Sequence, residues 1–225
     1  MRRLVVLRPE PGARATVERA RVLGLEVLAM PLFRIAPLDW QAPEPGGFDG
    51  LLVTSANALH HGGEQLQRLR GLKAYAVGEA TAAAAREAGF DVAATGDSGV
   101  ERLLGSLEAG MKLLHLCGED RTQVVARQAI TALPVYRAEA LEPPSCFAGI
   151  GGSTVAVHSP RAGRRLGELA DDEGLERGHI RVAAISPAAA EAAGPGWQCC
   201  EAAQAPSDEA LLALAARLCD KPCPK

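Results

Sequence analysis

The sequence predicts an α/β protein of two doubly wound parallel-sheet domains of similar topology, joined by a two-stranded linker. Short apolar runs alternate with amphipathic stretches along the chain, as expected for strands that alternate with helices. A polar or glycine-containing turn follows most of these runs. Several segments also recur in the two halves of the chain, which favours two similar domains over one large domain.

The chain begins with a predicted parallel βαβ unit. An apolar run at Leu4–Leu7 leads through a turn and a helix to a second run at Leu25–Met30. Gly24 ends the helix at a position where a left-handed residue is favoured. A short crossover of this kind joins parallel strands with a right-handed sense. The residues expected on the buried face of the helix are Val17, Ala20 and Leu23.

The same pattern recurs through the rest of the chain. A helix is expected between residues 59 and 69, although Gly62 and Gly63 weaken its middle. An alanine-rich helix ends at Gly89. The further strands are expected at residues 51–53, 74–77, 91–94, 112–116, 154–157, 182–185 and 197–201.

Polar residues mark the expected starts of several helices. Ser159 and Ser186 each precede a proline, so the serine can cap the helix while the proline takes the first helical position. Ser98 and Glu101 fit a capping box. Ser207 precedes the C-terminal helix.

Similar segments occur in both halves of the chain at offsets of 104, 108 and 109 residues. These near-equal offsets favour two similar α/β halves, although all βα units resemble one another and this likeness could arise without a repeat. The three pairs are residues 53–56 with 157–160, residues 77–80 with 185–188, and residues 4–8 with 113–117.

Two segments lie outside the repeat and are predicted to link the domains. Pro31–Pro37 and Leu133–Leu141 both contain proline and residues that favour extended backbone. If both cross between domains, the first βαβ unit belongs with the C-terminal half. The expected domains are then a discontinuous one, residues 1–34 plus 138–225, and an inserted one, residues 35–137.

The composition excludes several classes of protein. A net charge of −3 gives no field that would attract nucleic acid. No apolar stretch approaches the roughly 20 residues of a membrane span. The apolar run near the N-terminus is shorter than the core of a signal peptide. We therefore expect a cytoplasmic protein that has neither nucleic acid nor a membrane as a partner.

The cysteines and histidines predict no metal site. No pair of C-x2-C motifs occurs, so the six cysteines are expected to be reduced thiols without zinc. Cys117 is expected to be a small buried thiol rather than a nucleophile. His60 and His61 have no Cys or carboxylate at ligand spacing. No phosphate-binding loop or dinucleotide fingerprint is present either.

The candidate ligand-binding residues lie in the turns that follow the expected strands. Ligands of open parallel sheets bind beyond the carboxyl ends of the strands, where helix N-termini favour anions. The candidate residues are Arg8, Thr54, Ser55, Ala56, Asn57, Gly78, Glu79, Thr81, Gly118, Ser159, Arg161 and Ser186.

Each serine or threonine of this set could simply cap a helix, and only the whole set points to a ligand. Two domains with such turns facing each other would form a cleft lined with amides and hydroxyls, suited to a ligand with many carboxylates. Tyr136 is one of two tyrosines and lies in a predicted linker strand. A role at the site and ordinary packing in the linker both remain open for this residue.

The ordered set of motifs resembles the uroporphyrinogen-III synthase family from about residue 4 to about residue 215. The strongest motif is Val77-Gly78-Glu79-Ala80-Thr81-Ala82, followed by Gly89-Phe90. The remaining motifs, in chain order, are residues 7–9, 53–58, 116–118, 134–136, 157–160 and 184–187.

The resemblance implies two α/β domains that bind a linear tetrapyrrole, hydroxymethylbilane, between them. It also implies that the protein is a cyclising hydro-lyase of heme biosynthesis, which inverts ring D, closes the ring with loss of water and needs no cofactor or metal. Helix N-termini can hold the carboxylates of such a substrate, and positioning would supply much of the catalysis. A monomer is expected, with hand-over of substrate from hydroxymethylbilane synthase.

The resemblance gives Tyr136 the role of assisting departure of the substrate hydroxyl, and gives the turn residues the role of binding substrate. One departure concerns the turn after Ser186, where many members carry threonines and this chain has Pro187, Ala188 and Ala189. Two alternatives stay open: a non-catalytic two-domain module that binds a polycarboxylate, and a catalytically silent synthase-like domain.

Overall fold

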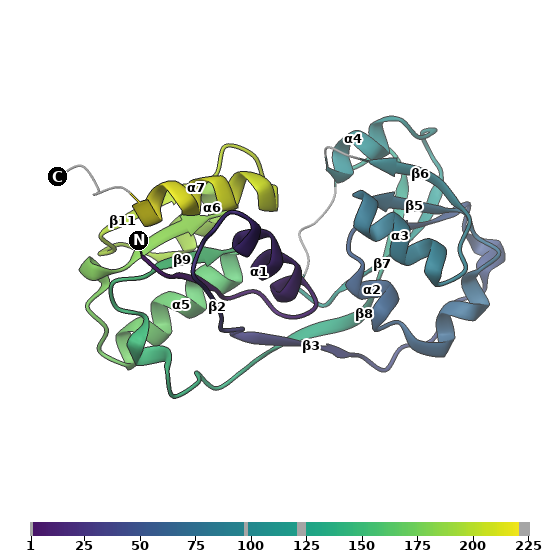
Figure 1. The fold of residues 1–225 in the computed structure, drawn as a ribbon. Coiled ribbons are helices and arrows are strands. Elements are labelled where there is room, and N and C mark those ends of the chain that lie inside the picture. The colour runs from purple at the N-terminus through teal and green to yellow at the C-terminus, as the bar shows by residue number, and fades with distance from the viewer. Residues whose placement is uncertain (1, 97–98, 121–124, 221–225) are drawn as a thin grey trace. The chain divides into compact units, whose positions relative to one another are not determined.

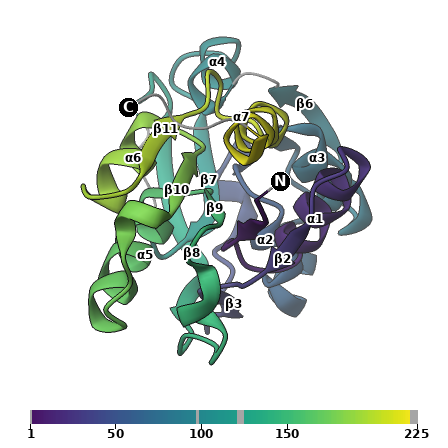
Figure 2. The ribbon, with the colours of Figure 1, turned by 60° about the vertical axis from the view of Figure 1, so that its left-hand side comes forward.

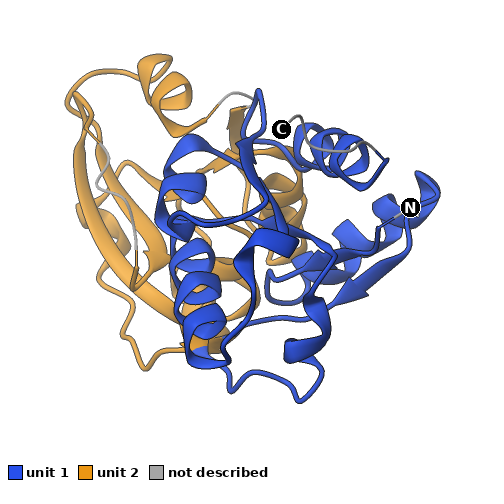
Figure 3. Cartoon of the chain, turned by 90° about the vertical axis from the view of Figure 1, so that its left-hand side faces the viewer, with its two compact units in different colours: residues 1–34, 140–225 blue, residues 35–139 orange. Residues whose placement is uncertain are grey.

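The chain forms two compact units (Figure 3). The structure is a computed structural model that describes residues 2–96, 99–120 and 125–220. Unit 1 comprises Met1–Arg34 and Ala140–Lys225, and unit 2 comprises Ile35–Glu139. Ser98, which was expected to belong to a capping box, lies outside the described residues.

Unit 1 contains a five-stranded parallel sheet in the order β11-β10-β9-β1-β2. Helices α1 and α7 cover one face of this sheet, and α5 and α6 pack side by side on the other (Figures 1 and 2). The strands are β1 (Leu4–Val6), β2 (Val27–Ala29), β9 (Thr154–Val157), β10 (Arg181–Ala184) and β11 (Cys199–Ala202). The helices are α1 (Gly12–Val22), α5 (Pro160–Asp172), α6 (Pro187–Ala193) and α7 (Asp208–Asp220), with 3-10 turns η3 (Phe147–Ile150) and η4 (Arg177–His179).

The sheet of unit 2 has the strand order β3-β8-β7-β4-β5-β6. Helices α2 and α3 cover one face and α4 covers the other (Figure 1). The strands are β3 (Phe33–Pro37), β4 (Gly50–Val53), β5 (Ala74–Val77), β6 (Val92–Gly96), β7 (Lys112–Gly118) and β8 (Ala129–Ala140). The helices are α2 (Asn57–His60), α3 (Glu79–Glu87) and α4 (Val100–Gly105), with 3-10 turns η1 (Pro45–Gly47) and η2 (Gly63–Leu69).

Alternation along the strands of unit 2 builds a separate core on each face of the sheet. Successive side chains of a strand point to opposite faces. Leu51 and Leu114 accordingly pack in the core under α2 and α3, whereas Leu52 and Leu113 pack against Leu103 of α4. Helices on both faces of parallel sheets confirm the predicted doubly wound α/β class.

The register of the two sheets confirms the internal repeat residue by residue. In unit 2, Leu51 lies opposite Leu114 on one side and Ala74 on the other. The offsets of 104, 109 and 108 residues convert these three residues into Val155, Val5 and Val182. Val155 of unit 1 lies opposite Val5 and Val182. The strand order β6-β5-β4-β7-β8 therefore corresponds to β11-β10-β9-β1-β2, with the first two strands of unit 1 moved to the front of the chain.

The structure adds a fourth pair of equivalent segments, Met30–Arg34 and Leu133–Arg137. Leu4 lies opposite Val27 and Leu113 lies opposite Ile130, so residues in β8 correspond to residues 103 positions earlier. Proline and arginine recur at the second and fifth positions of these segments, and an aromatic residue at the fourth. Phe33 of unit 1 is therefore the counterpart of Tyr136 of unit 2.

The two linker strands also pair in a reciprocal way. The N–H of Leu38 donates to the carbonyl of Val135 at 3.0 Å, and the N–H of Leu141 donates to the carbonyl of Leu32 at 2.9 Å. The offset of 103 residues relates these two bonds to each other. The pairing of β3 with β8 confirms a two-stranded linker.

Two local predictions differ from the structure. Leu23 was expected on the buried face of the first helix but is 54% exposed, because α1 ends at Val22 and Leu23 is its C-cap. The buried face of α1 is instead formed by Ala13, Thr16, Val17 and Ala20. The single helix expected between residues 59 and 69 is divided into α2 and η2, because Gly62 and Gly63 interrupt it.

Candidate functional site

The carboxyl ends of β4 and β7 bring Thr54 and His115 together in unit 2. The Thr54 hydroxyl lies 3.0 Å from Nε2 of His115, which is itself buried in β7. Thr54 is therefore held by the sheet and does not cap a helix with its side chain. Ser55 caps the short helix α2, because its hydroxyl accepts a hydrogen bond from the N–H of Asn57 at 3.3 Å. Ala56 takes the N-cap position of this helix.

The turn after β5 places Gly78, Glu79 and Thr81 at the start of α3. Gly78 has a φ of +83°, a left-handed conformation that favours glycine. Glu79 forms an exposed ion pair with Arg86 at 2.7 Å. Thr81 is buried, and its N–H donates to the carbonyl of Gly78 at 3.1 Å. Backbone groups and Glu79, rather than the Thr81 hydroxyl, thus form the surface of this turn.

Gly118, at the end of β7, lies directly against the ring of Tyr136 in β8. A methyl group at residue 118 would lie 3.0 Å from Cε2 and Cζ of Tyr136 and 3.2 Å from its hydroxyl oxygen. The N–H of Glu119 also donates to the carbonyl of Tyr136 at 2.9 Å. The absence of a side chain at residue 118 therefore lets the phenol lie flat against the strand end. Tyr136 is partly buried against the core beneath α2 and α3.

In unit 1, Ser159 and Ser186 cap the two helices that follow β9 and β10. The Ser159 hydroxyl accepts from the N–H of Ala162 at 3.1 Å, and the Ser186 hydroxyl accepts from the N–H of Ala189 at 3.3 Å. Both prolines occupy the first helical turn. The capping chemistry predicted from the sequence is confirmed at both positions.

Arg161, in the first turn of α5, lies over the ring of Phe33. Its guanidinium carbon is 4.8 Å from the ring centroid, a cation–π distance. Arg161 is the counterpart of Asn57 at the 104-residue offset, and Phe33 is the counterpart of Tyr136. The unit-1 edge thus places a cation against an aromatic ring where unit 2 has an amide and a phenol.

Arg8 belongs to a cluster of polar side chains around Asp208. Asp208 Oδ1 accepts hydrogen bonds from Thr16 and His158, each at 2.9 Å, and lies 3.4 Å from Nη1 of Arg8. Asp208 Oδ2 lies 2.7 Å from Arg19. We call these five side chains, from Arg8, Thr16, Arg19, His158 and Asp208, the Asp208 cluster.

Burial and hydrogen bonding set the charges of the Asp208 cluster. Burial acts to raise the pKa of Asp208, but hydrogen bonds from His158, Thr16 and Arg19 outweigh it and hold this pKa well below its ordinary value. Burial lowers the pKa of His158, against the opposing effect of its hydrogen bond to Asp208. At neutral pH the cluster therefore contains a carboxylate, a neutral imidazole and two guanidinium groups.

The candidate residues lie at corresponding places of the two units. At the offsets of the repeat, Ser55 corresponds to Ser159, and Gly78 corresponds to Ser186. Arg8 corresponds to Cys117, which is buried as expected. Each unit thus brings its own candidate residues to the carboxyl edge of its own sheet.

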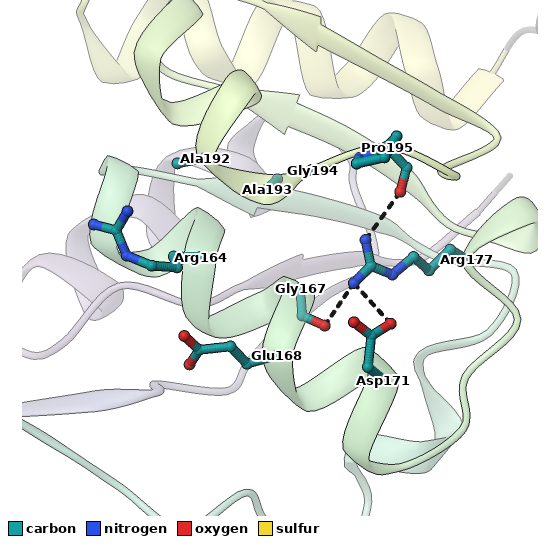
Figure 4. A pocket seen from close by; sticks show the side chains of 9 residues that line it. All are labelled: Arg164, Gly167, Glu168, Asp171, Arg177, Ala192, Ala193, Gly194 and Pro195. Atoms are coloured by element: carbon teal, nitrogen blue, oxygen red, sulfur yellow. Dashed lines mark hydrogen bonds and ion pairs between the residues drawn. The ribbon is translucent and has the colours of Figure 1, made fainter.

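A pocket of about 560 Å³ lies away from these edges (Figure 4). It is formed by α5, the end of α6 and Arg177, which precedes β10 and so lies at the amino edge of the sheet. Arg177 donates to the carbonyls of Gly167 and Pro195 and pairs with Asp171 at 2.8 Å (Figure 4). These bonds fasten α5 to the end of α6, so the pocket is explained by helix packing.

Sequence reasoning missed His115, Thr16 and Asp208 as members of these edges. His158 was noticed only as part of a repeated motif. A polar residue directly after a buried strand was available as a signal for His158, which occupies the position of Thr54. Asp208 and Thr16 lie in helices, and only the fold brings them to the end of β1.

No helix among the described residues is long and apolar enough to cross a membrane. Residues 2–96, 99–120 and 125–220 contain no group of three or more His, Cys, Asp or Glu side chains arranged to hold a metal ion. The five described cysteines, Cys117, Cys146, Cys199, Cys200 and Cys219, are free thiols.

The fold and the two edges define a class of protein: a two-unit doubly wound α/β protein with polar, anion-compatible turns at the carboxyl edge of each sheet. A sequence model of the family described as uroporphyrinogen-III synthase HemD matches residues 14–213. The chain belongs to the uroporphyrinogen-III synthase family, the cyclising hydro-lyases of heme biosynthesis. The match includes every candidate residue except Arg8.

Solved structures agree with this assignment at the level of fold. Uroporphyrinogen-III synthetase from Helicobacter pylori is 19% identical with a TM-score of 0.61, over 97% of this chain and 100% of that one. A mutant uroporphyrinogen III synthase from the extremely thermophilic bacterium Thermus thermophilus is 17% identical with a TM-score of 0.52, over 98% and 100%. The comparison with curated proteins found no match.

Proposed function

We propose that this protein converts hydroxymethylbilane into uroporphyrinogen III through the residues at the carboxyl edges of its two sheets. The observation that carries the proposal is the recurrence of polar turns at equivalent positions of both units, in a chain of this family. The reaction inverts ring D, closes the macrocycle and releases the hydroxyl group with a proton as water. No cofactor or metal is needed in this proposal.

The turn residues are proposed to hold the carboxylates of the substrate. The proposed set is Arg8, Thr54, Ser55, Ala56, Asn57, Gly78, Glu79, Thr81, Gly118, Ser159, Arg161 and Ser186. Amide groups at the starts of helices favour anions, and Arg8 and Arg161 add positive charge. Such contacts bring a flexible chain into the reactive geometry, which lowers the entropic part of the barrier.

Tyr136 is the proposed catalytic residue. Its phenol lies against Gly118, at the end of β7, and can donate a hydrogen bond. A hydrogen bond to the departing hydroxyl would stabilise the charge that develops as the carbon–oxygen bond breaks. Pyrrole nitrogen supplies the electron density for this step, so a modest contribution from one phenol is sufficient.

The proposal treats the discontinuous segment 1–34 plus 138–225 and the inserted segment 35–137 as two domains that both contact the substrate. It is supported by the separate cores of the two compact units. The proposal also has the protein act as a cytoplasmic monomer that receives its substrate directly from hydroxymethylbilane synthase.

An isomer assay tests the proposal. Purified protein is incubated with hydroxymethylbilane, and the uroporphyrinogen products are oxidised and separated by isomer. The type-III isomer should dominate and should grow with enzyme concentration. If only the spontaneously formed type-I isomer appears, while the protein binds the substrate, the protein is a binding module and the proposed activity is wrong.

A further inference from the structure

The Asp208 cluster holds Arg8 by only one of its guanidinium nitrogens. Nη1 of Arg8 donates to the Thr16 hydroxyl at 3.2 Å and to Asp208 Oδ1 at 3.4 Å. Among the described residues, Nε and Nη2 of Arg8 make no hydrogen bond. These two nitrogens form the side of the guanidinium that binds a carboxylate through two parallel hydrogen bonds.

Gly12, the first residue of α1, leaves room for this guanidinium. A methyl group at residue 12 would lie 2.5 Å from Nε and 2.6 Å from Cζ and Nη2 of Arg8. Any larger residue at this position would displace the guanidinium from the start of α1. The Arg8 side chain is 32% exposed, so an anion from solution can reach it.

The charges of the cluster also favour an anion. The carboxylate of Asp208 compensates one of the two guanidinium groups, because the buried His158 is neutral at neutral pH. One positive charge therefore remains within the five side chains. A partly buried guanidinium gains more from an added carboxylate than a fully solvated one does, since the local dielectric is lower.

We propose that Asp208 is a positioning residue that orients Arg8 so that its Nε and Nη2 bind one carboxylate of the tetrapyrrole substrate. Thr16 assists, because its hydroxyl donates to Asp208 and accepts from Arg8. Asp208 itself does not touch the substrate. The inference rests on the proposed function and adds to it the way in which one subsite is built.

Variants of Arg8 and Asp208 test the subsite by steady-state kinetics with hydroxymethylbilane. Arg8→Lys keeps the charge but loses the two-nitrogen edge, Gly12→Ala displaces the intact guanidinium, and Asp208→Asn removes its anchor. Each should raise KM about tenfold with a smaller change in kcat. Arg217→Gln is the control, because it removes an exposed cation from the far end of the same helix α7 and should leave KM unchanged.

Substrate analogues separate orientation from a general loss of structure. A series of hydroxymethylbilane analogues is prepared, each with one carboxylate side chain replaced by an alkyl group. The parent and Arg8→Lys should differ in KM for every analogue except the one that lacks the Arg8-bound carboxylate. A merely structural role would change KM for all analogues alike, and that result would overturn the inference.

The outcomes distinguish the subsite from the overall function. If the parent forms no type-III isomer, the proposed function fails and the subsite loses its substrate. If the parent is active but Arg8→Lys and Asp208→Asn keep the parent's KM, only the subsite is wrong. Thermal unfolding and circular dichroism of each variant establish that the compared proteins are folded.

Discussion

At the scale of single residues, the pair Phe33 and Tyr136 shows how the two edges diverged within one architecture. Both residues occupy the fourth position of equivalent segments, and both lie in a linker strand. The phenol hydroxyl is the difference between them. The fold therefore accepts phenylalanine at this position, and the hydroxyl of Tyr136 is free to serve chemistry.

Tyr136→Phe should lower kcat by about tenfold without a change in thermal midpoint, because the ring still packs against Gly118. Gly118→Ala should also lower kcat, since a methyl group there would push the ring away from its place. Gly46→Ala, at a site with open space in the same unit, is the control for an added methyl group. A Tyr136→Phe enzyme with the parent's kcat would remove Tyr136 from the mechanism.

His158 should make stability depend on pH in the weakly acidic range. Burial lowers the pKa of His158 below 6.5, so the unfolded chain takes up a proton there that the folded protein resists. Stability should therefore be full above about pH 6.5 and decline as the pH falls below it. Asp208 and Arg8 face this imidazole and take part in the shift.

Thermal midpoints measured from neutral into weakly acidic buffer report this effect. The decline of the midpoint on acidification should be smaller in His158→Gln than in the parent. His179→Gln, which removes an exposed imidazole from the same unit, is the control. Equal slopes in the parent and His158→Gln would exclude His158 as the source of the pH dependence.

At the scale of elements, the close packing of α5 on α6 depends on small residues. A methyl group at Gly163 would lie 2.5 Å from the carbonyl oxygen of Ala189 and 3.0 Å from the amide nitrogen of Ala193. Both atoms belong to the backbone of α6, so relief requires the two helices to move apart. Arg177 fastens the same pair of helices at their other end (Figure 4).

Gly163→Ala should therefore lower the free energy of unfolding by about 2 kcal/mol. Urea denaturation measures the change, with Gly178→Ala as a control because its added methyl group would meet only open space. An unchanged midpoint for Gly163→Ala would show that α5 and α6 can separate at no cost. The carboxyl edge of unit 1 would then rest on a looser support than the structure indicates.

The same scale shows what the sequence could and could not predict. Strand positions and the caps at Ser159 and Ser186 follow local rules, so they were predictable from a few neighbouring residues. The exposure of Leu23 was missed because periodicity does not fix the last turn of a helix. The Asp208 cluster joins residues from the ends of β1 and β9 and from α1 and α7, and no local pattern reveals such a group.

At the scale of the whole molecule, unit 2 has the properties of an independent folding unit. Both of its hydrophobic cores are formed by residues between Ala42 and Val135. A fragment of residues 35–139 should therefore unfold cooperatively by circular dichroism and calorimetry. Failure of the fragment to show a cooperative transition would mean that unit 2 depends on unit 1 for its stability.

The circular relation between the two units bears on the order in which the protein folds as it is made. Unit 2 is complete once residue 139 has been synthesised, whereas β1 lacks its partner β9 until residue 154 and beyond. Until then the first 34 residues hold a two-stranded fragment, too small to be stable by itself. Leu4, Val6 and Val17 stay uncovered until the C-terminal helix has been made. The ribosome thus delivers the inserted unit first, and the N-terminal segment is the part of the nascent chain with the greatest need for a chaperone.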